Sequence, residues 1–251
     1  MQTRIIAKLE VKPPYVVKPV MFEGLRKVGM IKDLMAKYFE QGSDEIAYID
    51  IVASLYRRDI LFDSILDGSK DLYIPLGVGG GIRDIDDISK LIHSGADKVI
   101  INTHLLAEDP NLINEASSVF GKQAIVVNIE AKKTDNDWIC YTDGGKIASN
   151  RYVLEWVKEV EQRGAGEILL QSIDCDGVEK GFDLELCKKV VDSVNIPVVV
   201  SSGAGSLEDI KEVIEYAKPS GVALSSILHH NSFTIQDIKN YLRKNNIKVS
   251  K

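Results

Sequence analysis

The chain has 251 residues, of which 45% are hydrophobic and 27% are charged, as in an ordinary globular protein with a large core. Its formal net charge of −6 argues against nucleic acid or an anionic membrane surface as the main partner. Its three cysteines lie far apart in the sequence, which argues against a disulfide framework or a structural zinc site. The charged N-terminal segment is unlike a signal peptide, and no apolar run approaches the roughly 20 residues of a membrane helix, so we expect a cytoplasmic protein.

Eight short apolar runs follow one another along the chain, and each is typical of a buried strand. They occupy residues 4–11, 45–51, 73–78, 98–102, 124–130, 167–173, 196–202 and 221–226. Amphipathic segments such as 84–95 and 206–217 lie between them, and Ser206 is a suitable N-cap for the second. This alternation predicts a closed α/β (β/α)8 TIM barrel that occupies residues 1–251 as one domain. Residues 137–147 predict an additional small hairpin after the fifth strand.

The two halves of the chain resemble each other at a nearly constant offset. The segment "IPLGVGGGIRDIDDI" matches "IPVVVSSGAGSLEDI", so Gly81 corresponds to Gly203 at an offset of 203 − 81 = 122 residues. "LEVK" matches "IEAK", so Glu10 corresponds to Glu130 at an offset of 130 − 10 = 120 residues. Such a long period predicts a barrel built from two similar half-barrels, with the first strand opposite the fifth and the third opposite the seventh.

A carboxylate ends each of the two matching strands. Glu10 ends the first strand and Glu130 ends the fifth, and the carboxyl ends of barrel strands carry the catalytic groups in this fold. Two carboxylates across one site can serve as general acid and general base. The alternative is that they are rim residues paired with Lys12 and Lys132.

Glycine clusters mark a second symmetric pair of sites. "GGGI" follows the third strand and "SSGAG" follows the seventh, and each leads into a helix. Backbone N–H groups in such turns bind phosphate well. Two copies across the mouth of the barrel predict a long substrate with a phosphate at each end. The glycines could instead serve only as tight turns.

Charged residues also stand at the opposite ends of four strands, and a ring of them would close the bottom of the barrel. They are Arg4, Glu45, Lys98 and Glu167, although structural ion pairing alone could explain such a ring. Cys175 and the pair His229-His230 lack nearby partners in sequence for nucleophilic or metal chemistry. We therefore expect no metal and no organic cofactor.

From end to end, the chain resembles the cyclase subunit of imidazole glycerol phosphate synthase of histidine biosynthesis. The resemblance is carried by "RIIAKLEVK", "VGGGIRDIDD", "GADKVIIN", "FGKQAIVVNIEAKK", "GAGEILLQSIDCDG" and "GFDLELCKKV". It implies a two-half TIM barrel that binds a bis-phosphorylated aminoimidazole carboxamide ribonucleotide across its top. It also implies a glutaminase partner on the bottom face that supplies ammonia through the barrel interior. The products that it implies are imidazole glycerol phosphate and an aminoimidazole carboxamide ribotide.

The resemblance also implies roles for individual residues. Glu10 and Glu130 fall where the family has two catalytic aspartates. Substrate and phosphate contacts are implied for Lys18, on a mobile loop after the first strand, and for Gly81, Asn102, Thr103, Asp176, Gly177, Gly203 and Ser225. The ammonia gate is implied for Arg4, Glu45, Lys98 and Glu167, and a contact with the glutaminase for Asp97.

The departures from the family pattern cluster at the mouth. Both carboxylates are longer by one methylene, and misplacing a catalytic group by about 1 Å can reduce the rate by about 100-fold. Lys8 stands in place of a typical cysteine, Gln171 in place of a threonine and Ser202 in place of a glycine, and the first loop reads "KPPYVVKP". These changes suggest retuned chemistry or a reshaped substrate.

Three alternative functions compete with the cyclase. One is a paralogue that uses ammonia from a glutaminase to amidinate a sugar precursor of a surface polysaccharide. Another is the sister isomerase of the same pathway, which needs no ammonia, so that the gate residues count against it. The third is a non-catalytic barrel that binds and activates a glutaminase.

Overall fold

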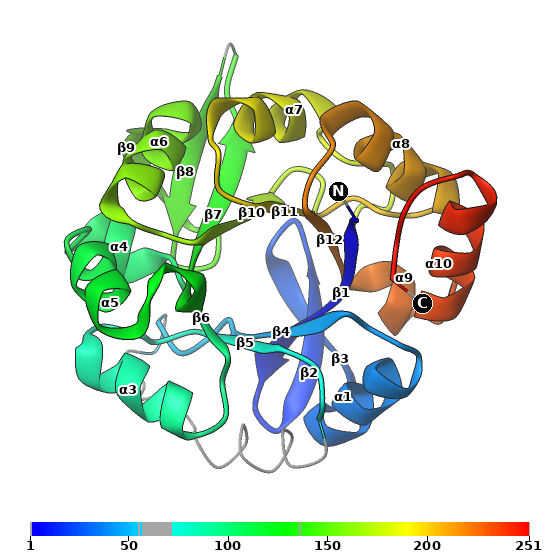
Figure 1. The fold of residues 1–251 in the computed structure, drawn as a ribbon, viewed down its shortest axis with the longest axis horizontal. Coiled ribbons are helices and arrows are strands. Elements are labelled where there is room, and N and C mark those ends of the chain that lie inside the picture. Colours follow the sequence, from blue (N-terminus) through cyan, green and yellow to red (C-terminus); the bar gives the residue numbers. More distant parts are fainter. Residues whose placement is uncertain (1, 55, 57–71, 136, 251) are drawn as a thin grey trace.

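The computed structural model describes residues 2–54, 56, 72–135 and 137–250, and eight parallel strands of these residues form a closed barrel (Figure 1). They are β1 (Arg4–Lys12), β4 (Glu45–Asp50), β5 (Leu76–Gly79), β6 (Lys98–Ile101), β7 (Ile125–Lys133), β10 (Glu167–Ser172), β11 (Val198–Ser201) and β12 (Gly221–Leu224). The barrel closes because β12 pairs with β1 and β7 pairs with β10, both in parallel. The predicted (β/α)8 fold is confirmed.

Two of the barrel strands begin later than the apolar runs suggested. β5 begins at Leu76 and β11 at Val198, each directly after a proline, Pro75 or Pro197. Proline has no backbone N–H to donate to a neighbouring strand, so it stands before these strands rather than within them. Both residues still accept a hydrogen bond at the carbonyl, from Ile46 and Ile168 respectively.

Helices surround the barrel (Figure 1). They are α1 (Ile31–Glu40), α3 (Ile85–His93), α4 (Thr103–Ala107), α5 (Leu112–Phe120), α6 (Val153–Arg163), α7 (Leu184–Ser193), α8 (Leu207–Ala217), α9 (Ser226–His229), α10 (Ile235–Lys244) and the 3-10 turn η1 (Lys122–Ala124). Ser206 caps α8 as predicted, and it forms a capping box with Asp209. None of the helices formed by described residues is long and apolar enough to cross a membrane.

Two antiparallel hairpins extend from the barrel. The hairpin predicted at residues 137–147 is confirmed: β8 (Trp138–Thr142) and β9 (Ile147–Tyr152) continue from β7. The expected loop after the first strand is wrong, because β2 (Tyr15–Val20) and β3 (Glu23–Met30) form a hairpin there. Met21 and Phe22, with φ of 49° and 63°, make a two-residue turn of the left-handed kind that hairpins favour.

The register of the strands repeats between the two halves. Glu10 pairs with Ile49 across β1 and β4, and Glu130 pairs with Gln171 across β7 and β10. The side chains that fill the middle of the barrel are apolar, and they form a cluster separate from the core between barrel and helices: Ile6, Ala47, Ile49, Ile100, Val126, Leu169, Val199 and Ala223. This apolar plug separates a charged lower end from a charged mouth.

Candidate active site

The two matching glutamates lie buried at the mouth of the barrel, with exposed fractions of 3% for Glu10 and 6% for Glu130. Glu10 accepts a hydrogen bond from Lys18 Nζ at 2.6 Å and pairs with Lys8 Nζ at 3.0 Å. Glu130 accepts one from the Gly145 backbone N–H, in the turn between β8 and β9, at 2.7 Å. The glutamates do not pair with Lys12 and Lys132, because both of these lysines are exposed.

The surroundings of the two carboxylates shift their pKa values in opposite directions. Burial alone would raise the pKa of Glu10, but the positive charges of Lys18 and Lys8 lower it to about 2. Burial raises the pKa of Glu130 to about 7, against the smaller lowering effects of the Gly145 and Asn102 hydrogen bonds and the Lys8 charge. At neutral pH Glu10 is therefore ionised, whereas Glu130 can both hold and release a proton.

Lys18 lies on β2 and joins Glu10 to a third buried carboxylate. Its Nζ is 2.9 Å from Asp176 Oδ1 and 3.0 Å from Oδ2. Burial and the neighbouring charge of Glu10 raise the pKa of Asp176. Ser202 also donates to Asp176, at 3.4 Å. Two lysines thus hold two carboxylates at the inner end of the hairpin.

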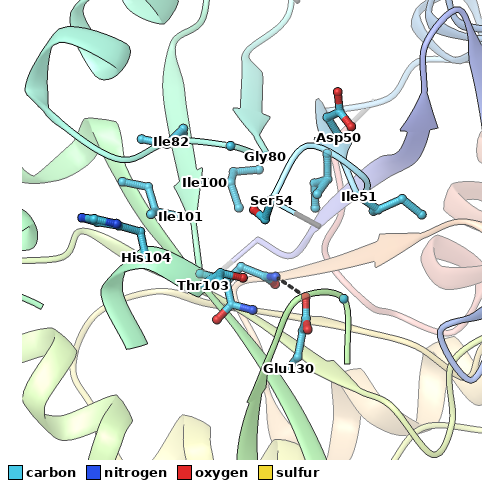
Figure 2. A pocket seen from close by; sticks show the side chains of 15 residues that line it. Asp50, Ile51, Ser54, Gly80, Ile82, Ile100, Ile101, Thr103, His104 and Glu130 are labelled. Atoms are coloured by element: carbon cyan, nitrogen blue, oxygen red, sulfur yellow. Dashed lines mark hydrogen bonds between the residues drawn. The ribbon is translucent and has the colours of Figure 1, made fainter. Parts of the chain in front are cut away.

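The predicted phosphate residues divide between two pockets at the mouth. One pocket lies at the ends of β5 and β6 and is lined by Gly81, Asn102, Thr103 and Glu130. Figure 2 shows Thr103 and Glu130 in this pocket. The other lies at the ends of β11 and β12 and is lined by Lys18, Asp176, Gly177, Gly203 and Ser225. The repeat thus places two pockets on strand pairs that correspond in the two halves.

The backbone has positive φ angles at corresponding positions of the two pockets. Gly80 and Gly81 have φ of 105° and 75°, and Ser202 and Gly203 have φ of 80° and 113°. A Cβ at Gly203 would lie 2.1 Å from the Gly181 carbonyl oxygen, so only glycine fits there. Turn geometry and close packing therefore account for the glycines by themselves, and phosphate binding is proposed below from the pockets. Ser202 holds a left-handed conformation that costs a non-glycine residue about 1 kcal/mol.

A closed ring of alternating charges lies at the other end of the barrel, and we call Arg4, Glu45, Lys98 and Glu167 the gate ring. Arg4 binds Glu45 at 2.7 Å and also binds Glu167. Lys98 binds both glutamates at 2.8 Å. Burial lowers the pKa of Arg4, but Glu167 and Glu45 more than offset this and raise it above its ordinary value.

The structure also places Asp97, the predicted partner-contact residue, next to this ring. It is exposed, and its carboxylate accepts a hydrogen bond from the Leu76 backbone N–H at 2.8 Å. The ring and Asp97 therefore belong to one face of the barrel, opposite the carboxylates.

Sequence reasoning missed a set of buried polar residues between the two glutamates. Lys8 and Gln171 stood out only as departures from a family pattern, and Asn128 was passed over within the apolar run of its strand. A buried polar residue in such a run needs a partner, which is the signal that could have identified Asn128. The hydrogen bond from the Gly145 backbone N–H to Glu130 could not be predicted from any residue pattern.

The two neighbouring histidines contact different partners. His229 Nδ1 lies 2.7 Å from the Tyr38 hydroxyl, whereas His230 Nδ1 lies 2.8 Å from Glu179. Within the described residues, no group of three or more His, Cys, Asp or Glu side chains is placed to hold a metal ion.

Comparisons with known proteins show the family of this chain. The family model described as "Histidine biosynthesis protein" matches residues 4–234. An imidazole glycerol phosphate synthase subunit HisF from Saccharolobus solfataricus is 46% identical over 98% of both chains. Proteins of the same name from Campylobacter concisus and Thermococcus onnurineus are 44% and 42% identical over 98% of this chain and 97% of theirs. This chain therefore belongs to the histidine biosynthesis protein family, alongside relatives named imidazole glycerol phosphate synthase subunit HisF.

Proposed function

We propose that this chain is the ammonia-using cyclase subunit of an imidazole glycerol phosphate synthase. It would convert a bis-phosphorylated aminoimidazole carboxamide ribonucleotide and ammonia to imidazole glycerol phosphate and an aminoimidazole carboxamide ribotide. The observation that carries the proposal is the pair of buried carboxylates, Glu10 and Glu130, with opposite pKa shifts at a mouth that holds two matching pockets.

The two pockets are suited to the two phosphates of such a substrate. Gly81, Asn102 and Thr103 line the first pocket, where Thr103 is at the N-terminus of α4. Gly203 and Ser225 line the second, together with Lys18, whose positive charge is shared with the carboxylates of Glu10 and Asp176. A substrate that spans the pockets lies over the mouth, so its reacting centre would meet the glutamates.

The two carboxylates are suited to different tasks in the reaction. Ammonia becomes positively charged when it adds to an electrophilic carbon, so a base must then remove a proton from the nitrogen. Glu130, with a pKa of about 7, is suited to accept that proton and to return it to a leaving group. Glu10 remains ionised between Lys8 and Lys18 and is suited to stabilise positive charge on the substrate.

The lower face is suited to receive ammonia from a partner. The relatives are named as subunits, and we propose a glutaminase as the partner of this chain, docked around the gate ring and the exposed Asp97. Ammonia entering there would cross the apolar plug above the ring. At least one ion pair of the ring must open for it to pass, because the four contacts form a closed circuit.

The competing functions are less well supported. An isomerase uses no ammonia and would therefore not need the gate ring beside the exposed Asp97. The relatives from four organisms carry the synthase name, which favours the cyclase over a barrel that amidinates a sugar. A purely activating barrel would have no use for a buried carboxylate whose pKa is near neutrality.

Direct supply of ammonia tests the proposal without the partner. Purified protein is mixed with the bis-phosphorylated ribonucleotide and an ammonium salt at alkaline pH, and imidazole glycerol phosphate is measured. We expect product with the wild-type protein and with Lys12→Met, whose side chain is exposed. We expect the rate of Glu130→Gln to fall by at least about 100-fold. Absence of product from wild-type protein that binds the ribonucleotide would contradict the proposal.

A further inference from the structure

A chain of hydrogen bonds runs through the barrel interior from one carboxylate to the other. Lys8 Nζ is 3.0 Å from Glu10 and donates to Gln171 Oε1. Gln171 Nε2 donates to Asn128 Oδ1 at 2.7 Å, and Asn128 Nδ2 donates to Glu130 at 3.4 Å. We call Lys8, Gln171 and Asn128 the central bridge. All three are buried, and the Lys8 side chain is 1% exposed.

The direction of the bridge follows from the chemistry of its first member. A lysine ammonium can only donate hydrogen bonds, whereas a side-chain amide donates at one end and accepts at the other. Lys8 therefore requires the oxygen of Gln171, which turns the Gln171 nitrogen towards Asn128. The Asn128 oxygen is then occupied, so its nitrogen faces Glu130. Every link consequently presents a donor towards Glu130, which favours the ionised carboxylate.

The bridge also breaks the symmetry between the two halves of the barrel. Lys8 and Asn128 occupy corresponding positions, since 128 − 8 = 120 is also the offset between the two glutamates. The repeat therefore places a cation beside Glu10 and a neutral amide beside Glu130. The apolar plug below keeps the surroundings poorly solvated, so charges and dipoles act strongly there.

We propose that Lys8 is a positioning residue: through Gln171 it orients Asn128, fixes the hydrogen bond that Asn128 donates to Glu130, and so separates the roles of two otherwise symmetric carboxylates. The inference rests on the proposed function of Glu130 as the proton-transfer group. It gives a purpose to two of the departures from the family pattern, Lys8 and Gln171, which are in contact with each other.

Several charged groups lie around the central bridge, and a titration of Glu130 must be distinguished from their titration. On the β1 side these are Glu10, Lys18 and Asp176, which are mutually paired. On the β7 side these are Glu130 and Asp143, whose charge acts on Glu130. His229 of α9 also senses Glu10, Lys18 and Lys8, but burial lowers its pKa to about 3, so it is neutral over the range of interest.

The pKa of Glu130 can be measured without any catalysis. Protein labelled with carbon-13 at the glutamate side-chain carboxyl is titrated by NMR, and the Glu130 signal is assigned by its loss in Glu130→Gln. Lys8→Met removes the charge and the donor at similar length. We expect the pKa of Glu130 to rise by about half a unit or more. The control Lys12→Met, on the same strand but exposed, is expected to leave it unchanged.

A second variant separates positioning from simple charge. Gln171→Met keeps the Lys8 charge but interrupts the bridge, and we expect it to raise the pKa of Glu130 as well. The double variant Lys8→Met/Gln171→Met is expected to shift the pKa by less than the sum of the single shifts. A shift with Lys8→Met and none with Gln171→Met would overturn the proposal, because Lys8 would then act through its charge alone. Should Lys8→Met fail to fold, the result with Gln171→Met still decides the question.

The kinetic readout follows the same logic and distinguishes the two proposals. With added ammonia, the pH at which the rate rises is expected to move upward in both variants by the same amount as the NMR titration. If wild-type protein forms no product, the proposed function fails, yet the NMR titration still tests the bridge. If product forms and neither variant moves the pH profile or the titration, the bridge proposal fails alone.

Discussion

The same substitution at two symmetric positions is predicted to change stability in opposite directions. Folding raises the pKa of Glu130 from 4.5 to about 7, so keeping this carboxylate ionised in the folded protein at pH 8 costs roughly 3 kcal/mol. Glu130→Gln removes that cost, and we expect it to stabilise the protein by ~1–3 kcal/mol at pH 8. Glu10→Gln instead takes a carboxylate from two buried lysines, and we expect it to destabilise the protein by about 3 kcal/mol.

The pH windows of the two effects follow from the direction of each pKa shift. A carboxyl group whose pKa is raised on folding destabilises the protein as the pH rises, here between about 4.5 and 7. The benefit of Glu130→Gln should therefore largely vanish at pH 5. A carboxyl group whose pKa is lowered on folding stabilises above its unfolded pKa of 4.5, and Glu10 loses this contribution as the pH falls towards 2.

Urea unfolding at pH 5 and pH 8 measures both effects, with Glu23→Gln at an exposed position as the control. The reasoning is refuted if the two variants change the free energy of unfolding in the same direction at pH 8. It is also refuted if Glu130→Gln stabilises equally at both pH values, since ionisation of the carboxylate would then not be the cause.

Three further predictions concern other parts of the molecule. Ser202→Gly removes a non-glycine residue from a position with φ of 80°. Because this relieves ~1 kcal/mol of backbone strain, it should raise the midpoint of thermal unfolding by about 2–4 °C. An unchanged midpoint would show that the hydroxyl contact offsets the strain. Gly203→Ala places a Cβ 2.1 Å from a backbone oxygen. It should weaken binding of the bis-phosphorylated ribonucleotide, measured by calorimetry, at least about tenfold. The control Gly24→Ala, at a position with open space around it, should not weaken binding. Lys98→Met leaves two buried gate glutamates with one partner fewer and should lower the free energy of unfolding by about 1–3 kcal/mol. The rate with added ammonia should stay within about twofold of the wild-type rate. A large loss of that rate would argue against a role confined to the lower face.

The sequence was sufficient to predict the barrel because its signals are local. β-branched runs bounded by glycine and proline identify buried strands, and Ser206 identifies the start of a helix. The internal repeat then located the glutamates at matching strand ends without reference to any structure. These features depend on the chain itself, so tertiary packing did not alter them.

The contacts between the glutamates could not be predicted in the same way. The resemblance implied a mobile loop after the first strand, yet this segment forms the hairpin of β2 and β3, and β2 also pairs with β1. Lys18 is thereby buried against Glu10. Such an ion pair depends on where a hairpin folds back, which residue patterns do not specify. The asymmetry of the two pKa values is therefore a property of the tertiary structure.

The central claim is that Glu130 acts as a base with a pKa near neutrality while Glu10 remains ionised. The most direct test is the pH dependence of imidazole glycerol phosphate formation at saturating ribonucleotide, with the rate normalised to the concentration of free ammonia. We predict that the normalised rate of the wild-type protein rises with pH to a plateau, with its midpoint near 7. A normalised rate that is constant between about pH 5.5 and 8.5, or that falls as the pH rises through this range, would contradict the account.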